Sequence, residues 1–135
     1  MQTSLAQILS QSRLMAGLPV DVMEGLALHF EDSRAVPAGE VFKKSGDEVD
    51  AAFLVHSGNV QVMENPGLAD DNYAYTVGRG EVIGVPSLLD RQVPDAEYRA
   101  AEDTTLATLP RSAFEQWLAQ HPEYREPLAQ NAARD

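Results

Sequence analysis

Residues 52–62 read AFLVHSGNVQV, two short apolar runs separated by a turn at Ser57-Gly58-Asn59. The runs Phe53-Leu54-Val55 and Val60-Gln61-Val62 consist largely of the aromatic and β-branched side chains that favour strands. Gly58 stands where a tight hairpin needs a positive φ, which only glycine adopts at low cost. The stretch therefore predicts an antiparallel hairpin in which Gly58 has a structural role.

Further strand-like runs lie on both sides of this hairpin. They are Val41-Phe42, residues 73–77, Val82-Ile83 and residues 106–109. Turn-forming segments separate the runs at close spacing, namely Pro37-Ala38-Gly39, Ser45-Gly46-Asp47, Asn65-Pro66-Gly67 and Gly78-Arg79-Gly80. Short strands at this spacing are typical of antiparallel sandwiches, barrels and rolls. The sequence predicts a mainly β fold with flanking helices, an antiparallel β-roll or jelly roll of about eight strands.

Helical patterns precede the β-rich centre. Residues 5–15 carry apolar side chains mostly at helical spacing, and Gly17-Leu18-Pro19 ends that run. We expect a second helix after Pro19, with Asp21 as its cap, ending near Glu31. The N-terminal helix is assigned to residues 1–17, and the roll with its adjoining helices to residues 18–120.

A third helix is expected after Pro110. Ser112 and Glu115 have the spacing of a capping box. The apolar face of this helix is predicted to pack into the core and comprises Phe114, Trp117 and Leu118. Residues 121–135 are assigned to a polar C-terminal segment, where Pro127 argues against a long helix.

Composition narrows the classes of function. The chain has 135 residues, a length that predicts one domain. It carries 21 acidic and 10 basic side chains, and the electrostatic field of the resulting net charge of -11 repels nucleic acid. The absence of cysteine excludes disulfides and thiolate chemistry. The N-terminus has no basic leader region and no apolar run approaches the length of a membrane span, so we expect a cytoplasmic chain without a membrane partner.

Enzyme chemistry finds little support. A cupin-type metal centre needs two or three histidines and a carboxylate on neighbouring strands, and of His29, His56 and His121 only His56 falls near a predicted strand. The Gly-x-Ser-x-Gly elbow of hydrolases is absent, and Ser87 has no evident base beside it. We expect no metal and no catalytic residue.

An ordered series of motifs carries a family resemblance. The series consists of residues 37–42, residues 45–47, residues 52–62, residues 80–84 and residues 100–114. In this order they resemble the first strand, the next two strands, the approach to the phosphate-binding cassette, and the closing strand with its helix in the cyclic-nucleotide-binding domain family, as in catabolite-activator/FNR-type regulators and kinase regulatory subunits. The resemblance covers residues 18–120 and implies a ligand-binding β-roll without catalysis.

The cassette implied by the resemblance departs from the family pattern. In the family, a glycine followed by glutamate opens a short helix, and an arginine closes the segment. The glutamate accepts hydrogen bonds from the ribose hydroxyl, and the arginine forms a charge-assisted fork to the cyclic phosphate. Here Gly84 is retained, Val85 takes the glutamate position, and Pro86 lacks an amide hydrogen.

The arginine position is also altered. Counting forward from Gly84 places Asp95 there, and counting back from Ala100 places Pro94 there. Losing the charged fork costs about 1.5–3 kcal/mol of binding free energy. Arg91 is an alternative cation if its loop brings it into the pocket. The candidate ligand-binding residues are Ile83, Gly84, Val85, Pro86, Ser87, Arg91, Pro94, Asp95 and Ala96.

The sequence supports two hypotheses about the function of this chain. The leading hypothesis is a non-enzymatic regulatory, sensor or interaction module that does not bind cyclic AMP or cyclic GMP in the usual way. The alternative is a functional sensor of a cyclic nucleotide or another small anion that uses Arg91. The expected partners are a small-molecule ligand and a protein partner or fused output domain. We expect no cofactor and no nucleic acid.

Overall fold

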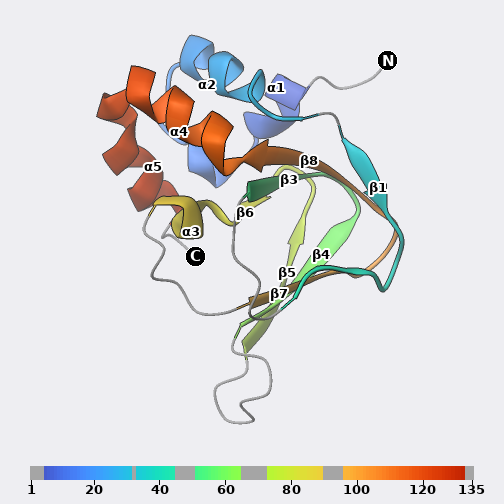
Figure 1. Cartoon of the computed structure of the whole chain (residues 1–135). Helices are drawn as coiled ribbons and strands as arrows, with labels where there is room; N and C mark the ends of the chain where they lie inside the picture. Colours follow the sequence, from blue (N-terminus) through green and yellow to red (C-terminus); the bar gives the residue numbers. More distant parts are fainter. Residues whose placement is uncertain (1–4, 32, 45–50, 65–72, 90–95, 133–135) are drawn as a thin grey trace.

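The β-rich centre forms two antiparallel sheets of four strands each (Figure 1). The computed structural model describes residues 5–31, 33–44, 51–64, 73–89 and 96–132. One sheet has the order β1-β8-β3-β6, and the other has the order β2-β7-β4-β5. The strands are β1 Arg34–Val36, β2 Val41–Lys43, β3 Ala51–Ser57, β4 Asn59–Glu64, β5 Tyr73–Gly78, β6 Val82–Ile83, β7 Ala96–Ala100 and β8 Thr104–Pro110. The predicted antiparallel roll is confirmed.

The turn at Gly58 joins two sheets rather than two paired strands. β3 pairs with β8 and β6, whereas β4 pairs with β5 and β7. The expected hairpin pairing of β3 with β4 is therefore wrong, although both strands and the turn between them are present. Gly58 has φ +89°, and an added Cβ would lie 2.5 Å from Asp103 O, so glycine is required by both conformation and space. β3 instead pairs with β8, which lies about fifty residues further along the chain.

The same kind of crossing recurs along the chain. The connections β1 to β2, β5 to β6 and β7 to β8 also pass from one sheet to the other. Hydrogen bonds tie these crossings together. Thr104 Oγ1 accepts from Asn59 N at 3.2 Å, and Asp103 Oδ1 accepts from Ala38 N at 2.9 Å. Repeated crossing between two facing sheets is what makes the fold a roll.

The N-terminal helical region differs in detail from the expectation. It consists of α1 Leu5–Leu9, a 3-10 turn η1 Arg13–Met15 and α2 Val20–Ala27. The predicted single helix over residues 5–15 is interrupted at Ser12, whose hydroxyl accepts from Leu14 N at 3.1 Å. Pro19, not Asp21, is the N-cap of α2. The helix ends at Ala27 because the chain turns into the sheet, where Glu31 N donates to Thr108 O at 2.7 Å.

The C-terminal segment is more ordered than its composition predicts. α4 spans Arg111–Gln120, and its N-cap residue is Pro110, which forms no side-chain cap hydrogen bond. The capping box expected at Ser112 therefore does not form. After η2 Pro122–Tyr124, residues Arg125–Ala132 form α5. Pro127 is the third residue of α5, where the missing amide hydrogen has no intrahelical partner to lose. Leu128 is fully buried, so packing stabilises a helix of weak intrinsic preference.

Two hydrophobic clusters occupy opposite faces of the β1-β8-β3-β6 sheet. The helical cluster lies between this sheet and the helices, and the roll cluster lies between the two sheets. Members of the helical cluster are Ile8, Leu9, Leu14, Met15, Val22, Met23, Leu26, Ala27, Phe30, Ala52, Leu54, Val85, Leu88, Ala107, Leu109, Phe114, Trp117, Leu118 and Leu128. Members of the roll cluster are Val36, Val55, Val60, Val62, Val77, Ile83, Ala96, Tyr98, Ala100 and Leu106. The side chains of the third helix that were predicted to be core are buried.

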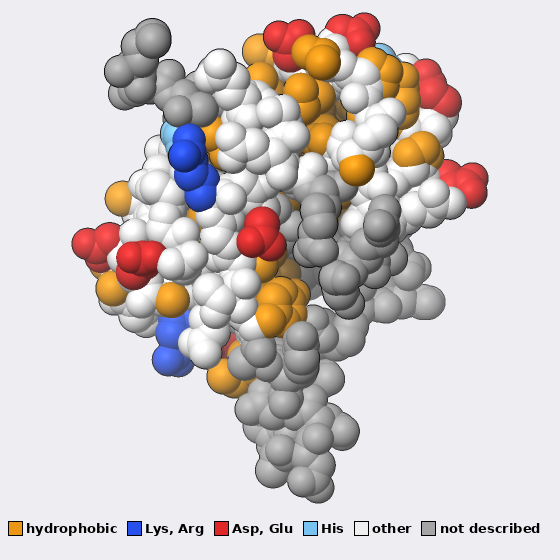
Figure 2. Space-filling model, turned by 180° about the vertical axis from the view of Figure 1, so that it is seen from behind, with side chains coloured by type: hydrophobic (Ala, Val, Ile, Leu, Met, Phe, Trp, Pro, Cys, Tyr) orange, Lys and Arg blue, Asp and Glu red, His pale blue; other side chains and the backbone are white. Residues whose placement is uncertain are grey.

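The surface reflects the acidic composition. Figure 2 shows acidic side chains on both sides of the face that it displays, while basic side chains lie only towards its left. Within the described residues, this face carries no continuous basic patch of the kind that binds a phosphate backbone.

Replacing Gly58 by alanine tests the crossing. We expect a loss of roughly 2–4 kcal/mol in the free energy of unfolding, because the positive φ is strained and the Cβ meets backbone. Gly39 is the matched control, since it has φ +87° with nothing within 4 Å of an added Cβ. Urea denaturation of both alanine variants measures the difference. Equal losses would show that Gly58 serves conformation alone.

Replacing Leu128 by alanine tests the docking of α5. Removing a fully buried leucine should lower the free energy of unfolding by about 2–5 kcal/mol. Gln130→Ala, at an exposed position of the same helix, should change it by less than about 0.5 kcal/mol. Urea denaturation followed by Trp117 fluorescence gives both values. A Leu128→Ala variant as stable as the control would show that α5 does not pack in solution.

Candidate functional site

The cassette helix lies directly against strand β3. β6 pairs with β3 through Ile83 and Phe53, and Gly84 then turns the chain into α3 Val85–Leu89. Gly84 has φ +94°, and an added Cβ would lie 3.0 Å from Ala51 O. Glycine is therefore needed here both for its conformation and for the close approach of α3 to the sheet. The local geometry thus accounts for glycine at position 84.

The residues on either side of Gly84 belong to different clusters. Ile83 is buried in the roll cluster, between the sheets. Val85 is 1% exposed and belongs to the helical cluster, together with Leu88. Val85, which the resemblance aligns with the family's glutamate, therefore packs among apolar side chains on the helical side of the sheet.

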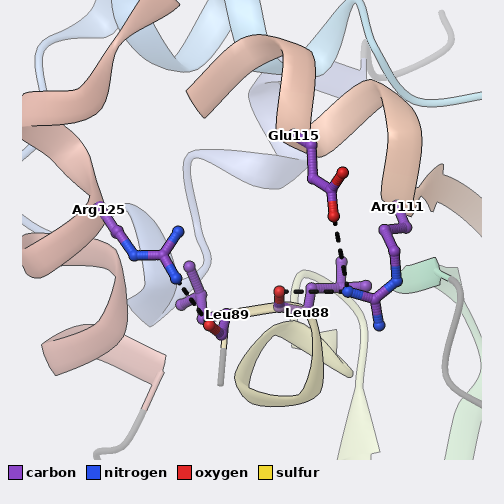
Figure 3. A network of polar contacts seen from close by, with 5 residues as sticks. All are labelled: Leu88, Leu89, Arg111, Glu115 and Arg125. Atoms are coloured by element: carbon purple, nitrogen blue, oxygen red, sulfur yellow. Dashed lines mark hydrogen bonds and ion pairs between the residues drawn. The ribbon is translucent and has the colours of Figure 1, made fainter. Parts of the chain in front are cut away.

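Two arginines from the C-terminal helices bind the last turn of α3. Arg111 Nη1 donates to Leu88 O at 3.4 Å, and Arg125 Nη2 donates to Leu89 O at 2.8 Å. Figure 3 shows the two guanidinium groups reaching consecutive carbonyl oxygens from α4 and α5. Glu115 lies 3.8 Å from Arg111 in an i,i+4 ion pair. Cations at a helix C-terminus complement its exposed carbonyls, so this contact holds the cassette helix to α4 and α5.

The opposite end of α5 is held to the N-terminal region. Asn131 Nδ2 donates to Leu14 O at 2.8 Å and to Ala16 O at 3.0 Å. α5 therefore bridges the cassette and the N-terminal helices. A movement of α3 would have to be matched by a movement of α5 or by rupture of these hydrogen bonds.

The roll side of the cassette is lined by aromatic rings. Phe42, Phe53 and Tyr98 form a cluster with ring centroids 5.3 to 6.2 Å apart. The Tyr98 hydroxyl lies 3.8 Å from the position of an added Cβ on Gly84. Beside Tyr98, the ammonium of Lys43 donates to Ala96 O at 2.7 Å. Sequence reasoning missed Phe42, Lys43, Phe53 and Tyr98 as site residues, because only the tertiary fold brings β2 and β7 beside the cassette.

The structure brings together only part of the candidate site. Ile83 and Ala96 are both buried in the roll cluster, whereas Val85, which follows Gly84, is buried in the helical cluster. Pro86 and Ser87 lie in α3. Arg91, Pro94 and Asp95 lie outside the described residues.

No group of three or more histidine, aspartate or glutamate side chains that could hold a metal occurs in the described part of the chain. His56 Nδ1 lies 2.9 Å from Ser33 Oγ at an exposed position, and His29 Nδ1 lies 3.0 Å from Gly25 O. Both rings take part in local hydrogen bonds. Among the described helices, none has both the length and the apolar character that a bilayer-spanning helix needs.

The chain is similar to domains of larger proteins. It is 37% identical over 91 residues to lysophospholipase nte1 of Aspergillus fumigatus, a match that covers 64% of this chain and 6% of the relative. It is 33% identical over 108 residues to lysophospholipase nte1 of Neosartorya fischeri, which covers 75% of this chain and 7% of the relative. The chain thus matches less than a tenth of these relatives' length.

Comparisons with solved structures and with family models identify the type of domain. The catabolite activator protein of Thermus thermophilus superposes with a TM-score of 0.71 at 30% sequence identity, covering 90% of this chain and 55% of that protein. The family model of the cyclic nucleotide-binding domain matches residues 33–121, which include both sheets and α4. Together with the crossed sheets and the glycine that opens the cassette, this match shows that the chain belongs to the cyclic nucleotide-binding domain family.

Proposed function

We propose that this chain is a non-enzymatic regulatory module whose cassette binds cyclic AMP and cyclic GMP only weakly. The observation that carries the proposal is the position of Val85. Its side chain is buried in the helical cluster, so position 85 offers no carboxylate for a ribose hydroxyl, and none can be supplied at this position without placing a charge in apolar surroundings. The retained fold and the altered contacts together favour regulation over standard nucleotide binding.

The sequence of the cassette supports weak binding in a second way. Either Pro94 or Asp95 takes the position of the family's arginine, and neither side chain can donate to a phosphate. A charge-assisted fork contributes about 1.5–3 kcal/mol, or roughly 10- to 150-fold in affinity. The net charge of -11 adds a mean field that disfavours a free anion.

A regulatory role is supported by the contacts of α3. The hydrogen bonds from Arg111 and Arg125 join the last turn of the cassette helix to α4 and α5. Leu88 and Leu128 also belong to one cluster. Occupancy of the roll can thus be transmitted to the C-terminal helices, where a following domain or a protein partner would sense it. The matched relatives are named lysophospholipases, and this chain covers only 6% and 7% of their length, so we infer that their activity lies outside the matched part.

Restoring the missing cation tests the proposal. We expect weak binding of cyclic AMP and cyclic GMP by the wild-type chain, and a roughly 10- to 150-fold gain in Asp95→Arg or in Pro94→Arg, whichever is in register. Asp21→Arg is the matched control for Asp95→Arg, because it makes the same change in charge at an exposed position of α2. Isothermal titration calorimetry of the four chains measures the dissociation constants.

Two outcomes would contradict the proposal. Tight binding by the wild type that Arg91→Ala abolishes would establish the alternative, a functional sensor with a different cation. Tight wild-type binding that Arg91→Ala leaves intact would show that binding depends neither on a carboxylate at position 85 nor on the Arg91 side chain.

Introducing the family's glutamate tests the position of Val85. Val85→Glu should lower the free energy of unfolding by roughly 2–4 kcal/mol at pH 8, because a carboxylate would be buried among apolar side chains. Burial would raise the pKa of the new carboxyl in the folded state, so its penalty on the charged form is present at high pH and disappears below the unfolded pKa of about 4.3. Val85→Gln is the uncharged control. Urea denaturation of each variant relative to wild type at pH 8 and pH 4 should show a pH-dependent difference for glutamate only, and a Val85→Glu chain as stable as wild type at pH 8 would place the side chain in solvent.

A further inference from the structure

Helix α2 carries two large apolar side chains on its solvent side. Among the described residues, three large apolar side chains are exposed, and two of them belong to this helix. Val20 is 65% exposed and opens the helix, and Leu28 is 86% exposed and is its C-cap residue in an αR conformation. Positions four and eight residues apart lie along the same side of a helix. Apolar residues repeated at this spacing are the anchors that helices use in recognition.

The exposure of this pair is not a failure of packing. The opposite side of α2 is already buried in the helical cluster through Val22, Met23, Leu26 and Ala27. Rotating the helix to bury the exposed pair would bring these four side chains into water, which costs more apolar burial than it gains. The fold therefore keeps Val20 and Leu28 outside the core.

Carboxylates lie among the exposed apolar side chains. Asp21 and Glu24 are exposed, and Glu24 lies four residues from both Val20 and Leu28, so it falls between them on the same side of the helix. Residues 20–28 contain no lysine or arginine. At the upper end of the molecule, where α2 lies in Figure 1, Figure 2 shows apolar side chains beside acidic ones. The outer face of α2, formed by these four residues, is thus apolar and negatively charged.

The charge of this face selects among the occupants that could cover it. A second copy of the chain would bring Asp21 and Glu24 against their own counterparts, and each copy has a net charge of -11. Anionic lipid surfaces and nucleic acids are repelled for the same reason. A helix with leucine-like side chains on one side, flanked by lysine or arginine, matches both the apolar pair and the carboxylates.

We propose that the outer face of α2 is a docking surface for a basic amphipathic helix of a partner protein. The apolar side chains of that helix would contact Val20 and Leu28, and its cations would pair with Asp21 and Glu24. This inference goes beyond the proposed function, because it does not depend on the affinity of the cassette for nucleotides. The surface is connected to the cassette all the same, since the buried side of α2 and Val85 belong to one cluster.

A defined peptide and two pairs of variants test the surface. The probe is a short synthetic peptide of leucine and lysine, with the two residue types on opposite sides of a helix. One comparison peptide has the same composition in scrambled order, and another has glutamate in place of lysine. Leu28→Gln removes an apolar anchor, and Glu24→Lys reverses a charge. Ala129→Gln on α5 and Glu123→Lys in η2 are the matched controls, because they place the same side chains at exposed positions elsewhere.

We expect the amphipathic lysine peptide to bind the wild-type chain more tightly than either comparison peptide. Its affinity should fall roughly 10- to 150-fold in Leu28→Gln. It should fall at least about fivefold in Glu24→Lys and stay within about threefold of wild type in both controls. Fluorescence anisotropy of the labelled peptide at physiological ionic strength measures the dissociation constants, and thermal denaturation checks that each variant is folded. In the wild-type chain, the backbone amide resonances of Glu24 and Leu28 should shift on binding and that of Ala129 should not, which tests the surface without any substitution.

Several results would overturn the inference. Equal weakening by Glu24→Lys and Glu123→Lys, with no effect of Leu28→Gln, would mean that the peptide responds only to net charge. Equal binding of the scrambled peptide, unmoved resonances in α2, or no binding of the amphipathic peptide would also contradict it. A wild-type dimer in sedimentation equilibrium that Leu28→Gln dissociates would assign the face to a second copy instead. Each of these results leaves the proposed function standing, whereas tight binding of cyclic AMP would contradict the proposed function and leave this surface in place.

Discussion

The roll depends on the interlocking of its sheet-to-sheet crossings around Asn59 and Thr104. Thr104 is 3% exposed, and its hydroxyl oxygen accepts a hydrogen bond from Asn59 N. The same hydroxyl lies 3.0 Å from Asn59 O, and Asn59 O accepts a hydrogen bond from Ala101 N. Asp103 binds the β1 to β2 crossing, and Gly58 fits against its carbonyl without a Cβ. Because these crossings lie outside the strand ladders, their polar groups need partners from one another. Meeting that requirement holds the two sheets face to face and creates the roll cluster between them.

The cassette inherits its geometry from this arrangement. β3 has Leu54 in the helical cluster and Val55 in the roll cluster, so the strand separates two apolar regions. α3 begins two residues after Ile83 of β6, so Ile83 packs in the roll cluster while Val85 at the start of α3 packs in the helical cluster. The segment from β6 to α3 therefore crosses from one apolar region to the other. The guanidinium groups of Arg111 and Arg125 add a directional connection to α4 and α5.

The side chains around the start of α3 come from several elements. Val85 packs in the helical cluster, whereas the bulge in β2 places the Lys43 ammonium beside the Tyr98 ring in the interior. Phe42, Phe53 and Tyr98 pack against one another from β2, β3 and β7. Apolar packing on one side of the first sheet and an aromatic cluster on the other therefore meet at Gly84.

The fold class and most of the strands could be predicted from the sequence, because runs such as Phe53-Leu54-Val55 favour strands in any context. The departures of the cassette from the family pattern at Val85 and at Pro94 or Asp95 remain predictions from the sequence. β7, with the sequence AEYRA, has little intrinsic strand preference and forms through its pairing with β2 and β4. Tertiary structure alone decided that β3 pairs with β8 rather than β4, that the polar segment after His121 packs through Leu128, and that Lys43 is buried. The physical reason is the same in each case: local preference acts over a few residues, whereas pairing, bulges and burial depend on partners that lie far apart along the chain.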